Sequence, residues 1–179
     1  GHTQRVTEYA VEIARQMVLN GSAEFSEEFI DNLYVAGMLH DIGKIGVPEA
    51  VLNKAGALTE EEYNVVKRHP LHGVEILSPL SELRQSLDGV KYHHERYDGK
   101  GYPFGLKGDT IPIVAAIISV ADAFDAMITD RPYRKGKTKD QAIGEMKRNM
   151  GTQFHPVPVQ ALIELYEQGQ IQPAASVLS

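Results

Sequence analysis

Two pairs of adjacent residues in this sequence could bind metal ions: His40 with Asp41, and His93 with His94. Neighbouring residues on a helix point about 100° apart, so the members of a pair would serve different metals or different faces of one cluster. A single histidine is by default a core or surface residue with a satisfied hydrogen bond. Two such pairs favour a metal site instead. The complete set of histidines is His2, His40, His69, His72, His93, His94 and His155.

Asp122 places a carboxylate inside an apolar segment, residues 113–129, that the sequence predicts to be a buried helix. A buried carboxylate needs a partner, and a metal ion is one of the few partners that fits a helix rich in Ala, Ile and Val. Asp125 lies one turn further along, where we expect it to cap or to support a ligand rather than to bind metal. Imidazole and carboxylate donors without thiolate suit Mn, Fe, Co, Ni or Zn.

Such a site would attract phosphate. Two carboxylates against two divalent cations leave a formal charge of about +2, and two-metal sites are suited to in-line displacement at phosphorus. A water bridging the metals would lose its proton near neutral pH and attack as hydroxide, so no side chain need become covalently attached. Lys44, three residues after Asp41, could hold a phosphate oxygen. From spacing alone, a solvated lysine at the end of a helix is an equal alternative.

Composition excludes several other classes of protein. The chain has 179 residues, a net charge of −6 and no cysteine, so disulfides, Cys-ligated zinc, iron–sulfur clusters and thiol nucleophiles are excluded. Nucleic-acid polymers and membrane surfaces are not expected as partners, because both need a basic face. No apolar run approaches the ~20 residues that cross a bilayer, and no signal peptide is recognised. We therefore expect a cytoplasmic location.

Helical periodicity runs through nearly the whole chain, which predicts one all-α domain with a core over about 2–168 and a frayed tail over 169–179. The abrupt start of the first helix suggests a piece of a longer, multidomain protein. Residues 44–58 and 97–110 are expected to be irregular. Helices are expected over 3–19, from Ser26 to near Gly43, from Thr59 to about His69, beyond Pro70 to Leu77, around Val90 to His94, over 113–129, from Thr138 to Gly151, and over 158–168.

The sequence resembles the HD-GYP family of the HD phosphohydrolase superfamily. The resemblance covers the chain from His2 to about Pro156. The HD pair alone would be a weak signal, whereas its combination with HHE and GYP is specific. The motifs occur in the family's order and read LHDIGK, HPLHG, HHERYDGKGYP, IPIVAAIISVADAFDAM and RPYR.

The resemblance implies an HD-type helical bundle with a two- or three-metal centre, most often Fe or Mn, with Ni, Co or Zn as alternatives. It also implies hydrolysis of cyclic di-GMP to linear pGpG, and in some members onward to GMP. Asp41 would be the bridging carboxylate. Matched residue by residue, the metal ligands are His2, His40, Asp41, His69, His93, His94 and Asp122; Asp41 and Lys44 are catalytic; and the substrate contacts are Lys44, Tyr102, Arg131 and Arg134.

Several roles remain open at this stage. Arg131 and Arg134 could clamp one phosphate or form a solvated basic corner, and Tyr102 could stack on a guanine or anchor its loop. The family motif GTQFDP reads GTQFHP here, and we expect His155 to have a local packing or capping effect. His72 is expected to lie outside the ligand set or at the surface.

Other functions are also considered. One is a phosphodiesterase that prefers cyclic GMP–AMP, and another is a catalytically weak sensor of cyclic dinucleotides. A third is an interaction module that contacts diguanylate cyclase (GGDEF) domains, and a fourth is a mononucleotide nucleotidase, which leaves HHE, GYP and RPYR unexplained. An N-terminal sensory or receiver domain and a homodimer are further expected partners.

Overall fold

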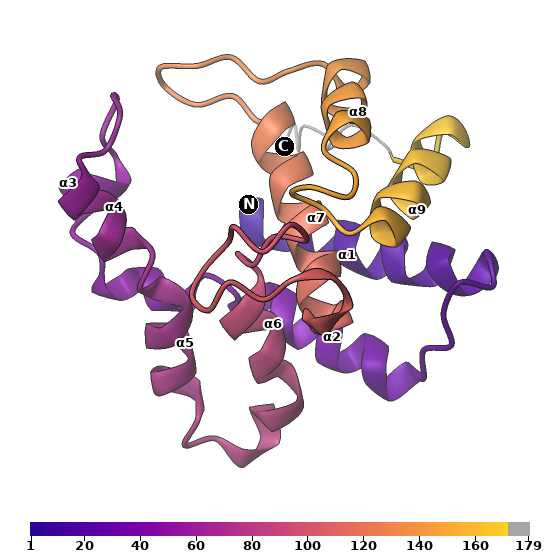
Figure 1. The fold of residues 1–179 in the computed structure, drawn as a ribbon, viewed down its shortest axis with the longest axis horizontal. Coiled ribbons are helices and arrows are strands. Elements are labelled where there is room, and N and C mark those ends of the chain that lie inside the picture. The colour runs from indigo at the N-terminus through magenta and orange to yellow at the C-terminus, as the bar shows by residue number, and fades with distance from the viewer. Residues whose placement is uncertain (172–179) are drawn as a thin grey trace, which may run out of the picture.

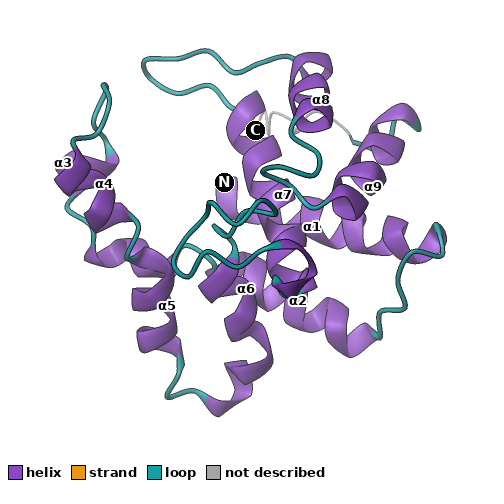
Figure 2. Cartoon of the chain, viewed as in Figure 1, coloured by secondary structure: helices purple, strands orange, loops and turns teal. Residues whose placement is uncertain are grey.

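The computed structural model describes residues 1–171, which form helices joined by loops, with no strand in that part of the chain (Figure 2). The all-α prediction is confirmed. The α-helices are α1 (His2–Leu19), α2 (Glu27–Leu39), α3 (Glu49–Leu52), α4 (Glu60–Val66), α5 (His69–Leu77), α6 (Leu87–Tyr92), α7 (Ile113–Ile128), α8 (Lys139–Arg148) and α9 (Pro156–Glu167), and the 3₁₀ helices are η1 (Ile42–Gly46), η2 (Ser81–Ser86) and η3 (Gly108–Thr110).

The core forms around α1 and α7. α1 packs against α2, α7 and α9, and α7 runs through the middle of the fold (Figure 1). Apolar residues at helical spacing on α1 are buried, including Val6, Ala10 and Ile13. α7 is apolar on most of its circumference and contributes fully buried Ile117 and Phe124. Asp122 and Asp125 are therefore carboxylates on an otherwise mostly apolar helix. No described helix combines the length and the apolar character needed to cross a membrane.

Several helix starts follow the predicted caps. The hydroxyl of Ser26 accepts from the backbone N–H of Phe29 at 3.0 Å, at the start of α2. Thr59 and Thr138 open α4 and α8 with capping boxes, as predicted, because the side chain three residues later returns a hydrogen bond to each.

Four helix ends differ from the prediction. α2 stops at Leu39 rather than near Gly43, and α4 stops at Val66 rather than at about His69. α6 stops at Tyr92, before His93 and His94, and α8 stops at Arg148 rather than at Gly151. Pro70 does not interrupt a helix but belongs to the first turn of α5, where its missing N–H would have no partner in any case. A histidine follows the ends of α2, α4 and α6, and its ring hydrogen-bonds to a carbonyl of the last turn, as described below.

Two smaller differences concern segments expected to be irregular. The short helix α3 forms within residues 44–58. We expected the tail from residue 169 onward to be frayed, but Ile171 is 6% exposed and packs into the core. Its carbonyl oxygen also accepts from the Lys139 Nζ at 2.9 Å. The rest of that predicted tail lies outside the described residues.

Candidate metal centre

The predicted metal ligands gather into two overlapping donor groups. Within each group, one donor atom per residue lies within 4.8 Å of the others. Asp41 belongs to both groups, which is the position that a bridging carboxylate requires. The first group consists of Asp41, His69, His93 and His94, and the second of His2, His40, Asp41 and Asp122.

Three buried histidines are oriented by the same local device. They follow the ends of α2, α4 and α6, where the last carbonyl groups lack partners within the helix. When Nδ1–H donates to such a carbonyl, the neutral ring carries its lone pair on Nε2 and presents it to the cluster. The bonds join Nδ1 of His40, His69 and His93 to the carbonyl oxygens of Gly37, Val66 and Val90, at 2.6, 2.8 and 2.8 Å.

Asp41 lies at the centre of the cluster. Its Oδ2 is 3.3 Å from the Nε2 of His40, and its Oδ1 is 3.4 Å from that of His69 and 3.7 Å from that of His93. Burial acts to raise the pKa of the Asp41 carboxyl, but the close approach of these three imidazole rings holds that pKa well below its usual range. Lys44 donates from Nζ to Asp41 Oδ2 at 3.1 Å. The carboxylate is therefore ionised, with Lys44 as a hydrogen-bond donor to Oδ2 and imidazole rings close to both oxygens.

The ring of His2 is held between two carboxylates of α7. Its Nε2 is 2.9 Å from Asp122 Oδ1, and its Nδ1 is 2.5 Å from Asp125 Oδ2. Asp125 is fully buried and also accepts from the Arg5 Nε at 2.8 Å. Hydrogen bonds to Asp122 and Asp125 raise the pKa of His2 to about 9. Asp125 thus hydrogen-bonds to the predicted ligand His2 and lies outside both donor groups, as the sequence indicated.

Two buried atoms lack a partner in a way that fits a cation. His40 Nε2 and Asp41 Oδ1 are inaccessible to solvent, and no hydrogen-bond partner is found for either within the described residues. Leaving a buried imidazole nitrogen and a carboxylate oxygen unpaired is costly. A divalent cation among these donors would satisfy both atoms. The donor set of imidazole nitrogens and carboxylate oxygens therefore fits a metal ion of the Mn, Fe, Co, Ni or Zn type.

The loop that carries the GYP signature packs directly on the cluster. The ring of Tyr102 stacks on His94, with ring centroids 4.9 Å apart and planes inclined by 14°. A Cβ atom at Gly101 would lie 2.4 Å from the Arg96 backbone nitrogen and 2.5 Å from the His94 oxygen. Only glycine fits so close to another backbone segment. The signature thus places an aromatic ring against a predicted metal ligand.

Glu95 fixes the same loop, a role that the sequence analysis missed. Its side chain is only 3% exposed. One carboxylate oxygen accepts from the Phe104 N–H at 2.7 Å and the other from the Leu106 N–H at 2.9 Å. The HHE motif contains this residue, but its partners lie nine and eleven residues further along the same loop and leave no pattern in the sequence.

The two arginines of the RPYR motif have different surroundings. They end a tight turn, in which Arg131 N–H donates to the Arg134 oxygen at 2.7 Å and the reverse bond is 3.1 Å. Arg131 lines a pocket of about 500 Å³ together with Asn53 and Tyr133. The Arg134 guanidinium instead donates to the carbonyl of Ala126 at 2.8 Å, near the end of α7. In this structure the Arg134 guanidinium is therefore bound to the backbone of α7, whereas Arg131 borders a pocket.

Comparison with known proteins agrees with this geometry. A family model described as "HD domain" matches residues 1–157. The chain belongs to the HD-domain family. It is 40% identical over 171 residues to a cyclic di-GMP phosphodiesterase of Thermotoga maritima, an alignment that covers 93% of this chain and 44% of the relative. It is 44% identical to the cyclic di-GMP phosphodiesterase response regulator RpfG of Xanthomonas campestris, with coverages of 89% and 41%.

A third relative is a 3′3′-cGAMP-specific phosphodiesterase of Vibrio cholerae, 39% identical over 87% of this HD domain and 33% of the relative. The chain spans less than half of the length of each of these relatives. The resemblance to HD-GYP proteins is confirmed at the level of sequence. An HDG"Y"P protein from Bdellovibrio bacteriovorus shares the fold, with a TM-score of 0.73 and 20% identity over 93% of this chain and 51% of that one.

Two further histidines lie outside the donor groups of this HD domain. His155 is the N-cap of α9, where its Nδ1 accepts from the Val157 N–H at 3.1 Å, and its Nε2 is 3.0 Å from Asp109 Oδ1. A capping histidine thus stands where the family motif has aspartate, in line with the local effect that we predicted. The ring of His72 packs against Gly46 of η1.

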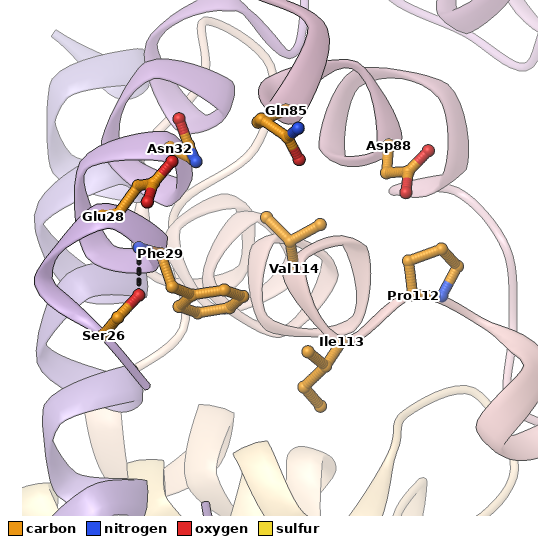
Figure 3. Close-up of a pocket in the computed structure, with 9 residues that line it drawn as sticks. All are labelled: Ser26, Glu28, Phe29, Asn32, Gln85, Asp88, Pro112, Ile113 and Val114. Atoms are coloured by element: carbon orange, nitrogen blue, oxygen red, sulfur yellow. Dashed lines mark hydrogen bonds between the residues drawn. The ribbon is translucent and has the colours of Figure 1, made fainter. Parts of the chain in front are cut away.

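A separate pocket of about 470 Å³ lies at the other end of the bundle (Figure 3). It is found at the N-terminal ends of α2 and α7, whereas the donors lie beyond the C-terminal end of α2 and in the third turn of α7. In Figure 3 the carboxylates of Glu28 and Asp88 stand on opposite sides of it. This pocket is therefore not part of the candidate metal centre.

Proposed function

We propose that this HD domain hydrolyses cyclic dinucleotides, with cyclic di-GMP as the main substrate. The observation that carries the proposal is the presence of Asp41 in both donor groups, with the Lys44 ammonium on its carboxylate. With two divalent ions held there, positive charge would be concentrated where a phosphodiester could bind. Relatives named as cyclic di-GMP phosphodiesterases, at 40% and 44% identity, support the choice of substrate.

Each residue of the centre has a proposed task. One ion would be held by His2, His40 and Asp122. A second ion would be held by His69, His93 and His94, and Asp41 would bind both ions. When bound, such ions would activate a water molecule for attack and neutralise charge on the phosphate.

The groups around the metal donors would handle the substrate. Lys44 Nζ would bind an oxygen of the scissile phosphate, where an ammonium stabilises the charge that develops there. Tyr102, stacked on His94, would border the substrate site. Arg131 would add positive charge at the wall of its pocket, whereas Arg134 would hold the turn against α7.

The reaction adds one water molecule across one phosphodiester bond. The water oxygen joins phosphorus, the bond from phosphorus to a ribose 3′ oxygen breaks, and that oxygen leaves as a hydroxyl. Cyclic di-GMP would thus give linear pGpG. A second round on the remaining diester would give GMP.

The test is turnover by the full chain loaded anaerobically with Mn²⁺ or Fe²⁺. Cyclic di-GMP and 3′3′-cGAMP are supplied separately, and the products are separated by liquid chromatography. We expect pGpG from cyclic di-GMP. Faster cleavage of 3′3′-cGAMP would favour the second candidate, which the Vibrio cholerae relative supports at 39% identity. Binding of either nucleotide without cleavage would contradict the proposal and favour a sensor.

A further inference from the structure

Lys67 lies beside the candidate centre and belongs to none of the motifs discussed above. It is the C-cap of α4, two residues before His69, and its side chain is half-buried. Its Nζ lies 5.2 Å from the ring centroid of Tyr63 and 5.5 Å from that of Tyr102. Tyr102 in turn stacks on His94. An ammonium group is therefore held one aromatic ring away from a predicted metal ligand.

The Lys67 ammonium has no anionic partner. Among the described residues no carboxylate lies within 4.0 Å of its Nζ, and it makes no hydrogen bond. Lys44 and Lys54, by contrast, are tied to carboxylates at 3.1 and 2.6 Å. An ammonium carries three donors, and aromatic faces satisfy them only weakly. Lys67 is thus free to bind an anion without first breaking an ion pair.

Resting on the function proposed above, we propose that Lys67 binds the phosphate of the dinucleotide that is not being cleaved. A cyclic dinucleotide carries two phosphates. The metal donors with Lys44 are assigned to the scissile one, and Arg131, which lines its own pocket with Asn53 and Tyr133, is not assigned to a particular phosphate. Tyr63 and Tyr102 meet edge to face, with centroids 6.3 Å apart, and limit where the ammonium can point. Lys67 is then a substrate-binding residue that favours a dinucleotide over a mononucleotide.

The experiment compares three variants of the full, Mn²⁺-loaded chain. Lys67→Met keeps most of the side chain's length but removes the charge, and Lys67→Arg keeps the charge. Lys91→Met is the matched control, because the Lys91 Nζ lies 5.2 Å from both the Tyr92 and the Phe104 rings. Those two rings contact each other, and among the described residues neither makes a ring contact with a histidine of the donor groups. Measured for each are metal content, kcat and KM for cyclic di-GMP at two salt concentrations, and calorimetric binding of inorganic phosphate.

We expect Lys67→Met to raise KM by about tenfold, the value of one charge-assisted hydrogen bond, while kcat and metal content stay near wild type. The rise of KM with salt should also be shallower, because one ionic contact is lost. Lys67→Arg should stay within about threefold of wild type, since it keeps the charge. Lys91→Met should match wild type.

Two results would overturn this assignment while leaving the proposed function intact. One is an unchanged KM in Lys67→Met, and the other is an equal loss in Lys91→Met, which would mean that both lysines only brace the loop. If wild type failed to cleave cyclic di-GMP but bound inorganic phosphate more tightly than Lys67→Met, the phosphate site would stand and the proposed function would fall. Wild-type protein that neither cleaves cyclic di-GMP nor binds phosphate would refute both.

Discussion

Groups that lie outside the donor cluster orient its histidine rings. His40, His69 and His93 each donate Nδ1–H to a backbone carbonyl, which leaves Nε2 for the metal. His2 differs, because its Nδ1 faces the carboxylate of Asp125. A carboxylate partner makes an imidazole a stronger donor than a carbonyl does. His2 should therefore be the ligand that depends most on a neighbouring side chain.

Replacing Asp125 tests this dependence. In Asp125→Asn the shape is kept but the negative charge that faces His2 and Arg5 is lost. We expect metal affinity at the group containing His2 to fall about 10- to 100-fold, as for other partners of metal-bound histidine. Titration with Mn²⁺ followed by elemental analysis measures it. Glu27→Gln, which removes an exposed ion pair with Arg15, is the control. Equal metal affinity in both variants would contradict the role of Asp125.

The sequence predicts donors better than it predicts what surrounds them. His40 with Asp41 stands out because two ligand types are adjacent, and Asp122 because its helix is apolar. Glu95 and Lys67 were missed, because the partners of Glu95 lie nine and eleven residues further along its loop and Lys67 reaches Tyr102 of that loop. Glu95 bonds the N–H groups of Phe104 and Leu106. Such contacts depend on tertiary packing and leave no periodic signal.

The loop between α6 and α7 is held in place by contacts of its own residues. Glu95 bonds two of its backbone N–H groups, and Gly101 brings it against the backbone near His94. With these two constraints the Tyr102 ring rests on the cluster without contributing a donor. The loop therefore borders the metal centre but should not be needed for metal binding.

Glu95→Gln tests whether the position of this loop and metal binding are independent. The amide keeps one acceptor and turns an NH₂ group toward a backbone N–H, so a buried donor loses its partner. We expect the free energy of unfolding to drop by about 1–3 kcal/mol, as for a buried hydrogen bond left unsatisfied. KM for cyclic di-GMP should rise, because the loop loosens around Tyr102, while metal content should stay at the wild-type value. Urea denaturation, kinetics and elemental analysis measure these. Loss of metal would show that the loop is part of the metal site.

Helix positions were predicted well, and helix ends less well, for a reason visible at α2 and α4. Periodicity predicts the length of the apolar face of a helix. Thr59 and Thr138 predict where α4 and α8 begin, and the structure confirms both positions. At the ends of α2 and α4, a histidine ring hydrogen-bonds to a carbonyl of the last turn. The sequence alone gives no sign that a ring nitrogen will take that carbonyl.

At the scale of the whole molecule, the centre couples metal binding to protons and to stability. Without metal, burial would lower the pKa of His40, but the adjacent carboxylates of Asp122 and Asp41 outweigh it and raise the pKa to about 10. The pKa of His2 is about 9. Both rings must be neutral to bind a metal ion, so loading should release protons.

Stability should therefore depend on pH differently with and without metal. In the metal-free protein, the raised pKa values of His2 and His40 stabilise the fold below the unfolded value of 6.5. This contribution falls as pH rises through the folded values. The Tm of the EDTA-treated chain should thus fall between pH 6.5 and 8.5, while that of the Mn²⁺-loaded chain changes less. Differential scanning fluorimetry at both pH values measures the difference in Tm between the Mn²⁺-loaded and the EDTA-treated chain. A difference that stays constant or becomes smaller as pH rises would contradict these assignments.

The central claim is that Asp41 serves two metal ions at once, and Asp41→Ala tests it most directly. Wild-type and variant chains are loaded with Mn²⁺, desalted, and compared for metal per chain and for turnover of cyclic di-GMP. Wild type should retain at least two ions per chain and cleave the substrate. The variant should lose metal from both donor groups and lose turnover with it, because one carboxylate belongs to both. A variant that kept one ion at full occupancy, or that still cleaved cyclic di-GMP, would contradict a shared Asp41.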